Sequence, residues 1–337
     1  MLGLALTVDL ADSFDPRQIG QATAHVSAAW TQMPENCRAG LIYVMAHLAA
    51  ADIQGFQGAA LDRRSHLDEA RDTARRMLTK HPEDGNAHAA AAWVALVEER
   101  WEDGLDHLRA GVDKPGFWAP ARLTIPRVLY RLGRYDEALS ELEAMPKGLR
   151  AAEEWPWLCV LLTAELRGTE TAEQAYLRWR EEHQQLPPRS LYAPAFEVYC
   201  LLGRANEAER ASRERIREYG PPPAHSPFDA ALGQYRLGEL TEDALLAATT
   251  IRAERLDARY YIGLRSLAKG DRGAAMEQFS ANARSGTLTA QFSKSETLLR
   301  RLQQDPSWPP WIPVREESTT QPDTSHHENT RQTGDSL

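Results

Sequence analysis

Histidines and paired carboxylates are the residues of this chain that could do acid–base or metal chemistry. The ten histidines include no HExxH zinc motif. His81 and His88 flank a predicted inter-helix turn, where a metal site is an alternative interpretation, and His326–His327 lies in a polar C-terminal stretch. Glu98–Glu99 and Glu153–Glu154 supply adjacent acids, but neighbouring residues on a helix point about 100° apart. We therefore interpret these groups as solvated polar positions and predict no metal site.

The three cysteines, Cys37, Cys159 and Cys200, are far apart and form no CxxC pair, which excludes zinc-ribbon and thioredoxin-type motifs. They lie among apolar residues, so we expect buried, reduced side chains in a cytoplasmic protein. The sequence also lacks a GxxxxGKS/T loop, a GxSxG nucleophile elbow and a GxGxxG loop after a predicted strand. The prediction is a protein with no catalytic residues and no cofactor.

Bulk charge and hydropathy narrow the classes of partner. The chain has 337 residues, of which 42% are hydrophobic and 26% charged, as in a folded globular protein. Its net charge is −9, so we expect no basic face for nucleic acid or anionic lipid. No apolar run reaches the roughly 18 residues needed to span a bilayer. The apolar start, Met1–Asp9, lacks a basic region and makes a poor signal peptide, and it would also suit a piece of a longer protein.

The strongest pattern in the chain is an internal repeat. An apolar segment, a glycine, a short polar turn and an alanine that opens a second periodic segment recur in residues 130–139, 200–209, 235–245 and 267–276. With the less regular copies, the corresponding positions are 65, 99, 133, 168, 203, 238 and 270, which are 34, 34, 35, 35, 35 and 32 residues apart. Such a period indicates a stacked array of supersecondary units.

Each unit is predicted to be a pair of helices. Apolar residues recur at helical spacing beside the glycine, as in Leu139, Leu142 and Met145. Glycine suits the left-handed residue that ends a helix, and an acidic residue after it favours the start of the next helix. A small residue about five positions on lets the two helices approach closely; these residues are Ala70, Gly104, Ala138, Ala208 and Ala275.

The period and the small residues resemble the tetratricopeptide repeat family. The last unit and an early unit match best, and their matching residues are Gly263, Ala275 and Phe279 in the last and Gly58, Ala70 and Pro82 in the early one. In a middle unit Pro126 replaces the small residue, which predicts a kinked or shortened first helix. The resemblance implies an all-α, right-handed superhelical solenoid of about seven antiparallel helix pairs with a capping helix.

We expect three parts along the chain. Residues 1–16 form an N-terminal extension, residues 17–304 the repeat array with its capping helices, and residues 305–337 a disordered polar tail. Residues 289–304 are predicted to be the C-terminal capping helix, which arrays need to shield their last apolar face. Trp308 and Trp311 either pack back on the last helices or belong to the tail, and the sequence leaves both interpretations open.

The resemblance also implies a concave groove that is lined by the first helix of each pair. The family's groove positions fall on Trp93, Arg127, Tyr130, Arg131, Trp155, Glu197, Tyr235, Arg236 and Tyr260, with Glu165 and His225 as further members. Tyr, Trp and Arg carry much of the binding energy at protein interfaces, and arginine pairs bidentately with carboxylates. The competing interpretation places the aromatic side chains in the inter-helix core and leaves the arginines simply exposed.

These observations favour a non-catalytic protein–protein interaction scaffold that holds a partner peptide or helix in the concave groove. Arrays of helix pairs suit this role because they offer a large, pre-formed surface at little ordering cost. Two alternatives remain open. One is an α/α-toroid-type enzyme, which the short and uniform turns disfavour; the other is a regulatory or sensory repeat module of a larger signalling protein.

Overall fold

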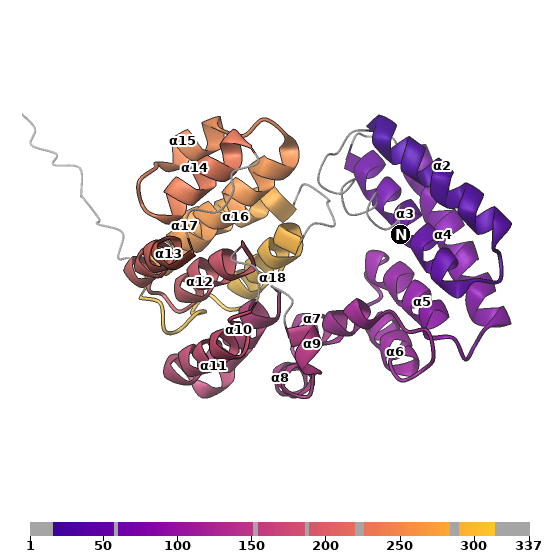
Figure 1. Ribbon diagram of the computed structural model, residues 1–337, viewed down its shortest axis with the longest axis horizontal. Helices are drawn as coiled ribbons and strands as arrows, with labels where there is room; N and C mark the ends of the chain where they lie inside the picture. Colours follow the sequence, from indigo (N-terminus) through magenta and orange to yellow (C-terminus); the bar gives the residue numbers. More distant parts are fainter. Residues whose placement is uncertain are drawn as a thin grey trace, which may run out of the picture.

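The computed structural model describes residues 16–313 except for 57–59, 151–153, 186–188, 220–225 and 284–289. In these residues every regular element is a helix, and the helices form seven successive pairs between α2 (Pro16–Gln32) and α18 (Ala290–Gln304), as Figure 1 shows. The pairs are α3 (Cys37–Phe56) with α4 (Ala60–Lys80), α5 (Gly85–Val97) with α6 (Trp101–Gly111), α7 (Thr124–Arg131) with α8 (Tyr135–Glu143), α10 (Glu154–Arg167) with α11 (Thr169–Glu182), α12 (Arg189–Leu201) with α13 (Ala205–Tyr219), α14 (Pro227–Arg236) with α15 (Glu242–Ala247), and α16 (Arg252–Ala268) with α17 (Arg272–Ala283). Two short helices, η1 (Ala119–Leu123) and α9 (Lys147–Arg150), flank the third pair.

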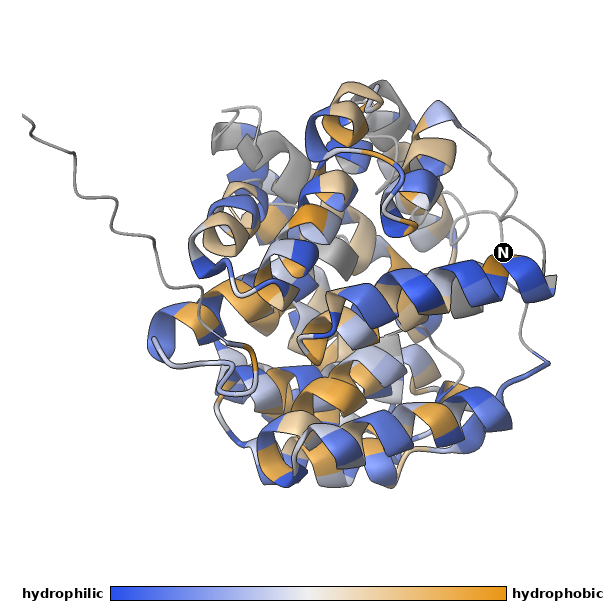
Figure 2. Cartoon of the chain, turned by 90° about the vertical axis from the view of Figure 1, so that its left-hand side faces the viewer, coloured by the Kyte–Doolittle hydropathy of each residue, from blue (hydrophilic) through white to orange (hydrophobic). Residues whose placement is uncertain are grey.

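First helices pack on one another where α3 meets α5, α10 meets α12 and α12 meets α16, whereas the third pair meets its neighbours through α6 on α7 and α8 on α10. The short α14–α15 pair does not separate the first helices of its two neighbours, since α12 packs directly against α16. Figure 1 shows the result as an open arc, with the first helices toward its inner side and α4, α6, α11 and α13 toward its outer side. Apolar residues gather on the helix faces that meet one another (Figure 2). The chain is therefore an all-α solenoid, as the repeat predicted.

The repeat glycines end the first helices in left-handed backbone conformations. Gly133, Gly203, Gly238 and Gly270 have φ angles of 75°, 74°, 78° and 80°. In the third pair, the amide of Gly133 donates to Tyr130 O and the amide of the next residue to Leu129 O, which closes the helix end. The prediction that glycine terminates each of these helices is confirmed.

In the α5–α6 turn the corresponding left-handed position is held by Glu99, with a φ of 60°. A side chain at such an angle costs about 1 kcal/mol relative to glycine. We therefore expect Glu99→Gly to raise the free energy of unfolding by about 1 kcal/mol, measured by urea denaturation. The matched control is Glu277→Gly in the exposed middle of α17, which should lower it by a similar amount. A loss of stability in Glu99→Gly would show that the turn does not need a left-handed residue.

The small residues after the turns lie where two helices of a pair touch. Ala70, Ala138, Ala208 and Ala275 are completely buried. A Cβ atom on Gly104 would lie 2.5 Å from Cδ2 of Leu96 on the facing helix, so no larger side chain fits there without movement. The predicted close helix approach is confirmed at these positions.

Pro126 shortens its unit's first helix, as predicted. It is the third residue of α7, where its missing amide hydrogen falls in the first turn and costs no helical hydrogen bond. The preceding residues form the 3-10 helix η1 in place of a longer α-helix. As a result α7 has 8 residues, against 14 in α10 of the next pair.

The C-terminal segment corrects the predicted boundary at residue 304. Residues 305–313 pack on the array, with Trp308 only 1% exposed and Ile312 4% exposed, and so they do not belong to a polar tail. The Trp311 indole donates to Leu201 O at 2.8 Å, and Ile312 lies against Gly203. Of the two interpretations left open for Trp308 and Trp311, packing on the array is correct. The rest of the predicted tail, 314–337, and residues 1–15 of the predicted extension lie outside the described residues.

Candidate protein-binding surface

The inner sides of α7, α10, α12 and α16 form one surface, and helix α18 lies on it. Besides packing on α16 and α17 of the last pair, α18 reaches carboxylates on α10 and α12 and an arginine on α7. Figure 1 shows α18 on the inner side of the arc, beside α10, α12 and α16. We call these contacts, together with Trp308, the α18 dock.

The first contact of the α18 dock is a buried ion pair. Lys294 Nζ lies 2.8 Å from Glu197 Oε2, and the two side chains are only 9% and 1% exposed. The Tyr261 hydroxyl donates to the other carboxylate oxygen at 3.1 Å. Lys294 Nζ also lies 5.8 Å from the Trp157 ring centre and 5.6 Å from that of Tyr260, within the range of cation–π attraction. A buried carboxylate is costly unless it is paired, so α12 requires a cation at this point.

The second contact pairs Arg301 of α18 with Glu165 of α10. Arg301 Nε lies 3.0 Å from Glu165 Oε1, and the side chains are 16% and 11% exposed. The Trp308 indole donates to the other oxygen of Glu165 at 3.2 Å. Both oxygens of this carboxylate are thus bonded by the C-terminal segment.

In the third contact the charges are reversed, because the arginine belongs to the array and the glutamate to α18. Arg131 of α7 lies 2.8 Å from Glu296 of α18, and its guanidinium stacks over the Trp101 ring at 3.6 Å from the ring centre. Burial lowers the pKa of Arg131, and Glu296 opposes that shift. The α18 dock therefore pairs with both basic and acidic side chains of this helix.

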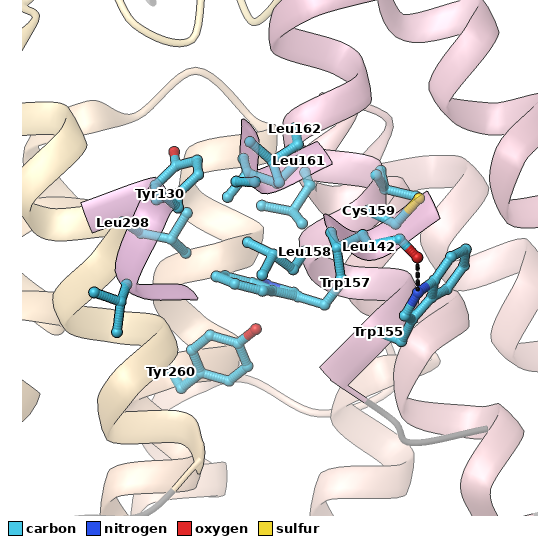
Figure 3. Close-up of a cluster of buried hydrophobic side chains, with 14 of the residues drawn as sticks. Tyr130, Leu142, Trp155, Trp157, Leu158, Cys159, Leu161, Leu162, Tyr260 and Leu298 are labelled. Carbon is cyan, nitrogen blue, oxygen red and sulfur yellow. Dashed lines mark hydrogen bonds between the residues drawn. The ribbon is translucent and has the colours of Figure 1, made fainter. Parts of the chain in front are cut away.

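Leucines fill the apolar part of the α18 dock. Leu298, Leu299 and Leu302 are 0%, 7% and 2% exposed. Figure 3 shows Leu298 beside Tyr130, with Trp157 and Tyr260 in the same cluster. Among the described residues, the hydroxyls of Tyr130 and Tyr260 and the indole nitrogen of Trp157 are buried without a hydrogen bond of normal geometry.

The groove residues predicted from the repeat divide into three groups. Tyr130, Arg131, Glu165, Glu197 and Tyr260 all lie at the α18 dock. Trp93 of α5 and Arg127 of α7 are half-buried and are not among the α18 dock contacts.

The remaining predicted groove residues do not lie at the α18 dock. The Trp155 indole donates to Leu142 O at 3.2 Å (Figure 3), and Tyr235 is fully buried with Arg265 over its ring at 4.0 Å. These two aromatic side chains belong to the inter-helix core, which was the competing interpretation. Arg236 stacks over the Tyr261 ring at 4.2 Å, and His225 lies outside the described residues.

Sequence reasoning missed the residues of α18 that fill the surface. Lys294 and Arg301 are seven positions apart, close to two helical turns, and Leu298 lies between them on the same face. That pattern was visible in the sequence, but it is equally typical of a capping helix.

The cysteines are buried, and His81 and His88 make contacts within the array. Burial raises the pKa of Cys37 and of Cys159 to about 11 and also raises that of Cys200, which keeps the thiols protonated. His81 lies 3.1 Å from Glu35, and His88 lies 2.9 Å from Pro82 O. Within the described residues no cluster of three His, Cys, Asp or Glu side chains is arranged to hold a metal ion.

A histidine pair lies in the first repeat unit: the buried His47 of α3 and the half-buried His66 of α4, whose Nδ1 atoms lie 2.9 Å apart. Only one of these two nitrogens donates a proton to the other, so a second proton would be repelled. Burial, assisted by His66, lowers the pKa of His47 to about 4.

The depressed pKa of His47 predicts loss of stability in acid. In the unfolded chain His47 takes up a proton below its ordinary pKa of about 6.5. In the folded protein it does so only near pH 4. The free energy of unfolding therefore falls as the pH drops through this window, by about 2–3 kcal/mol at pH 4.5. Urea denaturation at pH 7 and pH 4.5 measures this fall in the free energy of unfolding, with His47→Phe as the comparison. An equal acid loss in the variant would contradict the assignment.

Sequence comparisons do not assign the chain to a family. No protein-family model and no curated protein matches it. A tetratricopeptide repeat protein from Parabacteroides merdae is a similar solved structure, with 15% identity, a TM-score of 0.39, and coverage of 71% of this chain and 93% of that chain. The solenoid assignment rests on the helix pairs themselves. In the part of the chain that the structure describes, no helix has the length and hydropathy of a membrane span.

Proposed function

We propose that this protein is a non-catalytic, tetratricopeptide-type scaffold that binds a helix or peptide of a partner protein on the inner side of its arc. One observation carries the proposal: the inner surface already binds a helix, α18, through two ion pairs with buried carboxylates and a cluster of aromatic rings. Buried aromatic and arginine side chains of this kind are typical of protein-binding hot spots. The three free, buried cysteines support work in a reducing compartment such as the cytoplasm.

Trp93 and Arg127 mark where an external segment first meets the array. They are half-buried positions on the first helices α5 and α7, outside the α18 dock contacts. A ring and a guanidinium together suit a segment with an apolar side chain and a carboxylate. The proposed partner is a protein, since a net charge of −9 disfavours binding to nucleic acid.

Photo-crosslinking tests this function. A photoreactive phenylalanine analogue is placed at position 93 or 127, and in a control at Arg210, whose side chain is 68% exposed on the outer helix α13. We expect the inner positions to crosslink the same partner protein in cells, and Trp93→Ala to reduce its recovery while Arg210→Ala does not. Equal crosslinking from position 210, or no effect of Trp93→Ala in a normally folded variant, would overturn the proposal.

A further inference from the structure

We infer that a groove on the side of α10 opposite the α18 dock binds an aspartate or glutamate side chain of a partner protein. The groove is lined by residues of α10 and α11, by the last residue of α8 and by the last residue of α9. Figure 3 shows Trp155 and Cys159 of this groove on the side of α10 that lies away from Leu298 and Tyr260. The inference goes beyond the proposed function, because the groove shares no residue with the α18 dock.

The size of the groove suits one side chain. Its volume is about 180 Å³. A cavity of roughly 150 Å³ holds a benzene ring, whereas sites for drug-sized ligands begin at about 300 Å³. Two rings line it, Trp155 and Trp179, which are 7% and 2% exposed. Their indole N–H groups already donate to Leu142 O and Arg150 O, so the rings offer a ligand apolar surface rather than hydrogen bonds.

The charges that line the groove favour a single negative charge. They belong to three arginines and two glutamates: Arg150, Arg167, Arg178, Glu143 and Glu182. Three positive charges against two negative ones leave +1, which one carboxylate neutralises. A phosphate group carries about −1.5 to −2 at neutral pH and would exceed this charge. Charge complementarity therefore favours an acidic side chain over a phosphorylated one.

Two of the arginines have donors left for a ligand. Arg167 pairs with Glu143 at 2.6 Å. Arg150 is fixed by bonds from Nε to Met145 O at 2.8 Å and from Nη2 to Glu143 O at 2.6 Å, and among the described residues its Nη1 has no partner. Arg178 is exposed and makes no ion pair or hydrogen bond within the described part of the chain. A carboxylate between them would accept charge-assisted hydrogen bonds from both.

A second groove, between α11 and α13, provides an internal comparison. It is lined by two arginines, Arg180 and Arg215, and by two glutamates, Glu214 and Glu218. Arg215 pairs with Glu218 at 3.1 Å. The two positive and two negative charges leave no net charge for a ligand to neutralise. Arg178 and Arg180 thus lie on the same helix but line grooves of different net charge, and we assign the acidic ligand to the first groove only.

The test selects peptides from a random 12-residue display library on the full chain. The recovered peptides are then measured on Arg178→Glu and on Arg180→Glu, which make the same change of charge on the same helix. We expect a class of peptides that binds Arg178→Glu at least about tenfold more weakly than wild type, and Arg180→Glu within about twofold of it, because only the first variant loses a charged donor to the ligand. Each peptide of this class should contain an aspartate or glutamate whose replacement by the amide also weakens binding about tenfold.

The inference would be overturned if no recovered peptide distinguished the two variants, or if the class bound equally well with the amide in place of its acid. Phosphoserine at the acidic position should weaken binding, and tighter binding would contradict the assignment to a carboxylate. Arg178 is exposed, so we expect Arg178→Glu to keep the wild-type melting temperature. Peptides bound on the inner side should instead lose affinity in Trp93→Ala, which separates this test from that of the proposed function.

Discussion

Replacing Lys294 with methionine should lower the free energy of unfolding by about 3–5 kcal/mol. Methionine keeps most of the side-chain volume, but among the described residues it leaves the Glu197 carboxylate, 1% exposed, with the Tyr261 hydroxyl as its one remaining hydrogen-bond donor. The loss comes from the unpaired charge, since removing one member of a buried pair strands the other. Urea denaturation followed by circular dichroism at 222 nm measures it.

The double variant Lys294→Met, Glu197→Gln separates the charge from the packing. Without the carboxylate no stranded charge remains, so we expect the double variant to be more stable than Lys294→Met alone. Arg210→Met is the surface control: its pair with Glu214 spans 4.0 Å between exposed side chains and should contribute less than about 0.5 kcal/mol. A loss in Lys294→Met as small as that of Arg210→Met would contradict the burial of the pair.

Trp308→Ala should also cost about 3–5 kcal/mol, because it empties a large, fully enclosed site. The indole is 1% exposed, packs against Trp311 at 6.2 Å between ring centres, and donates to Glu165. Trp308→Phe keeps a ring and loses the donor, so its cost should be smaller, about 1–2 kcal/mol. Thermal unfolding distinguishes these outcomes, and a Trp308→Ala loss below that of Trp308→Phe would show that residues 305–313 do not hold the array.

The sequence was sufficient to predict the fold because its strongest signals are local. A left-handed glycine at Gly133 or Gly203 ends a helix wherever it lies, and a small residue such as Ala138 or Ala208 is needed wherever two helices cross closely. Both constraints act within one unit, so a period near 34 residues specifies the stack without knowledge of distant contacts.

The side chains that cover the inner surface of the array could not be predicted in the same way. The partners of Lys294 and Arg301 lie 97 and 136 positions earlier in the chain. Helical periodicity indicates that one face of residues 290–304 is apolar, but not whether that face covers the last pair alone or the inner side of several pairs. The family positions predicted Tyr130, Tyr235 and Tyr260 as groove residues, and all three rings are almost completely buried. Tyr235 lies in the inter-helix core, with the Arg265 guanidinium over its ring.

Trp308 and Trp311 illustrate a second limit. The sequence left their packing open, because the Pro-rich stretch around them leads into a segment of Ser, Thr, Asp and Glu that is typical of disorder. Their packing depends on acceptors presented by helices far away in sequence, Glu165 for one and Leu201 O for the other. Large indole rings beside a polar segment were the sequence signal that favoured packing.

A charge-swap cycle between Glu165 and Arg301 tests most directly whether the inner surface of the array binds helices by charge. Glu165→Lys and Arg301→Glu should each lower the free energy of unfolding by about 2–4 kcal/mol, because each places two like charges in a nearly enclosed site. The double variant restores an opposite-charge pair and should regain most of the loss. Additive losses in the double variant would mean that α18 does not lie against α10, and the binding surface described above would not exist.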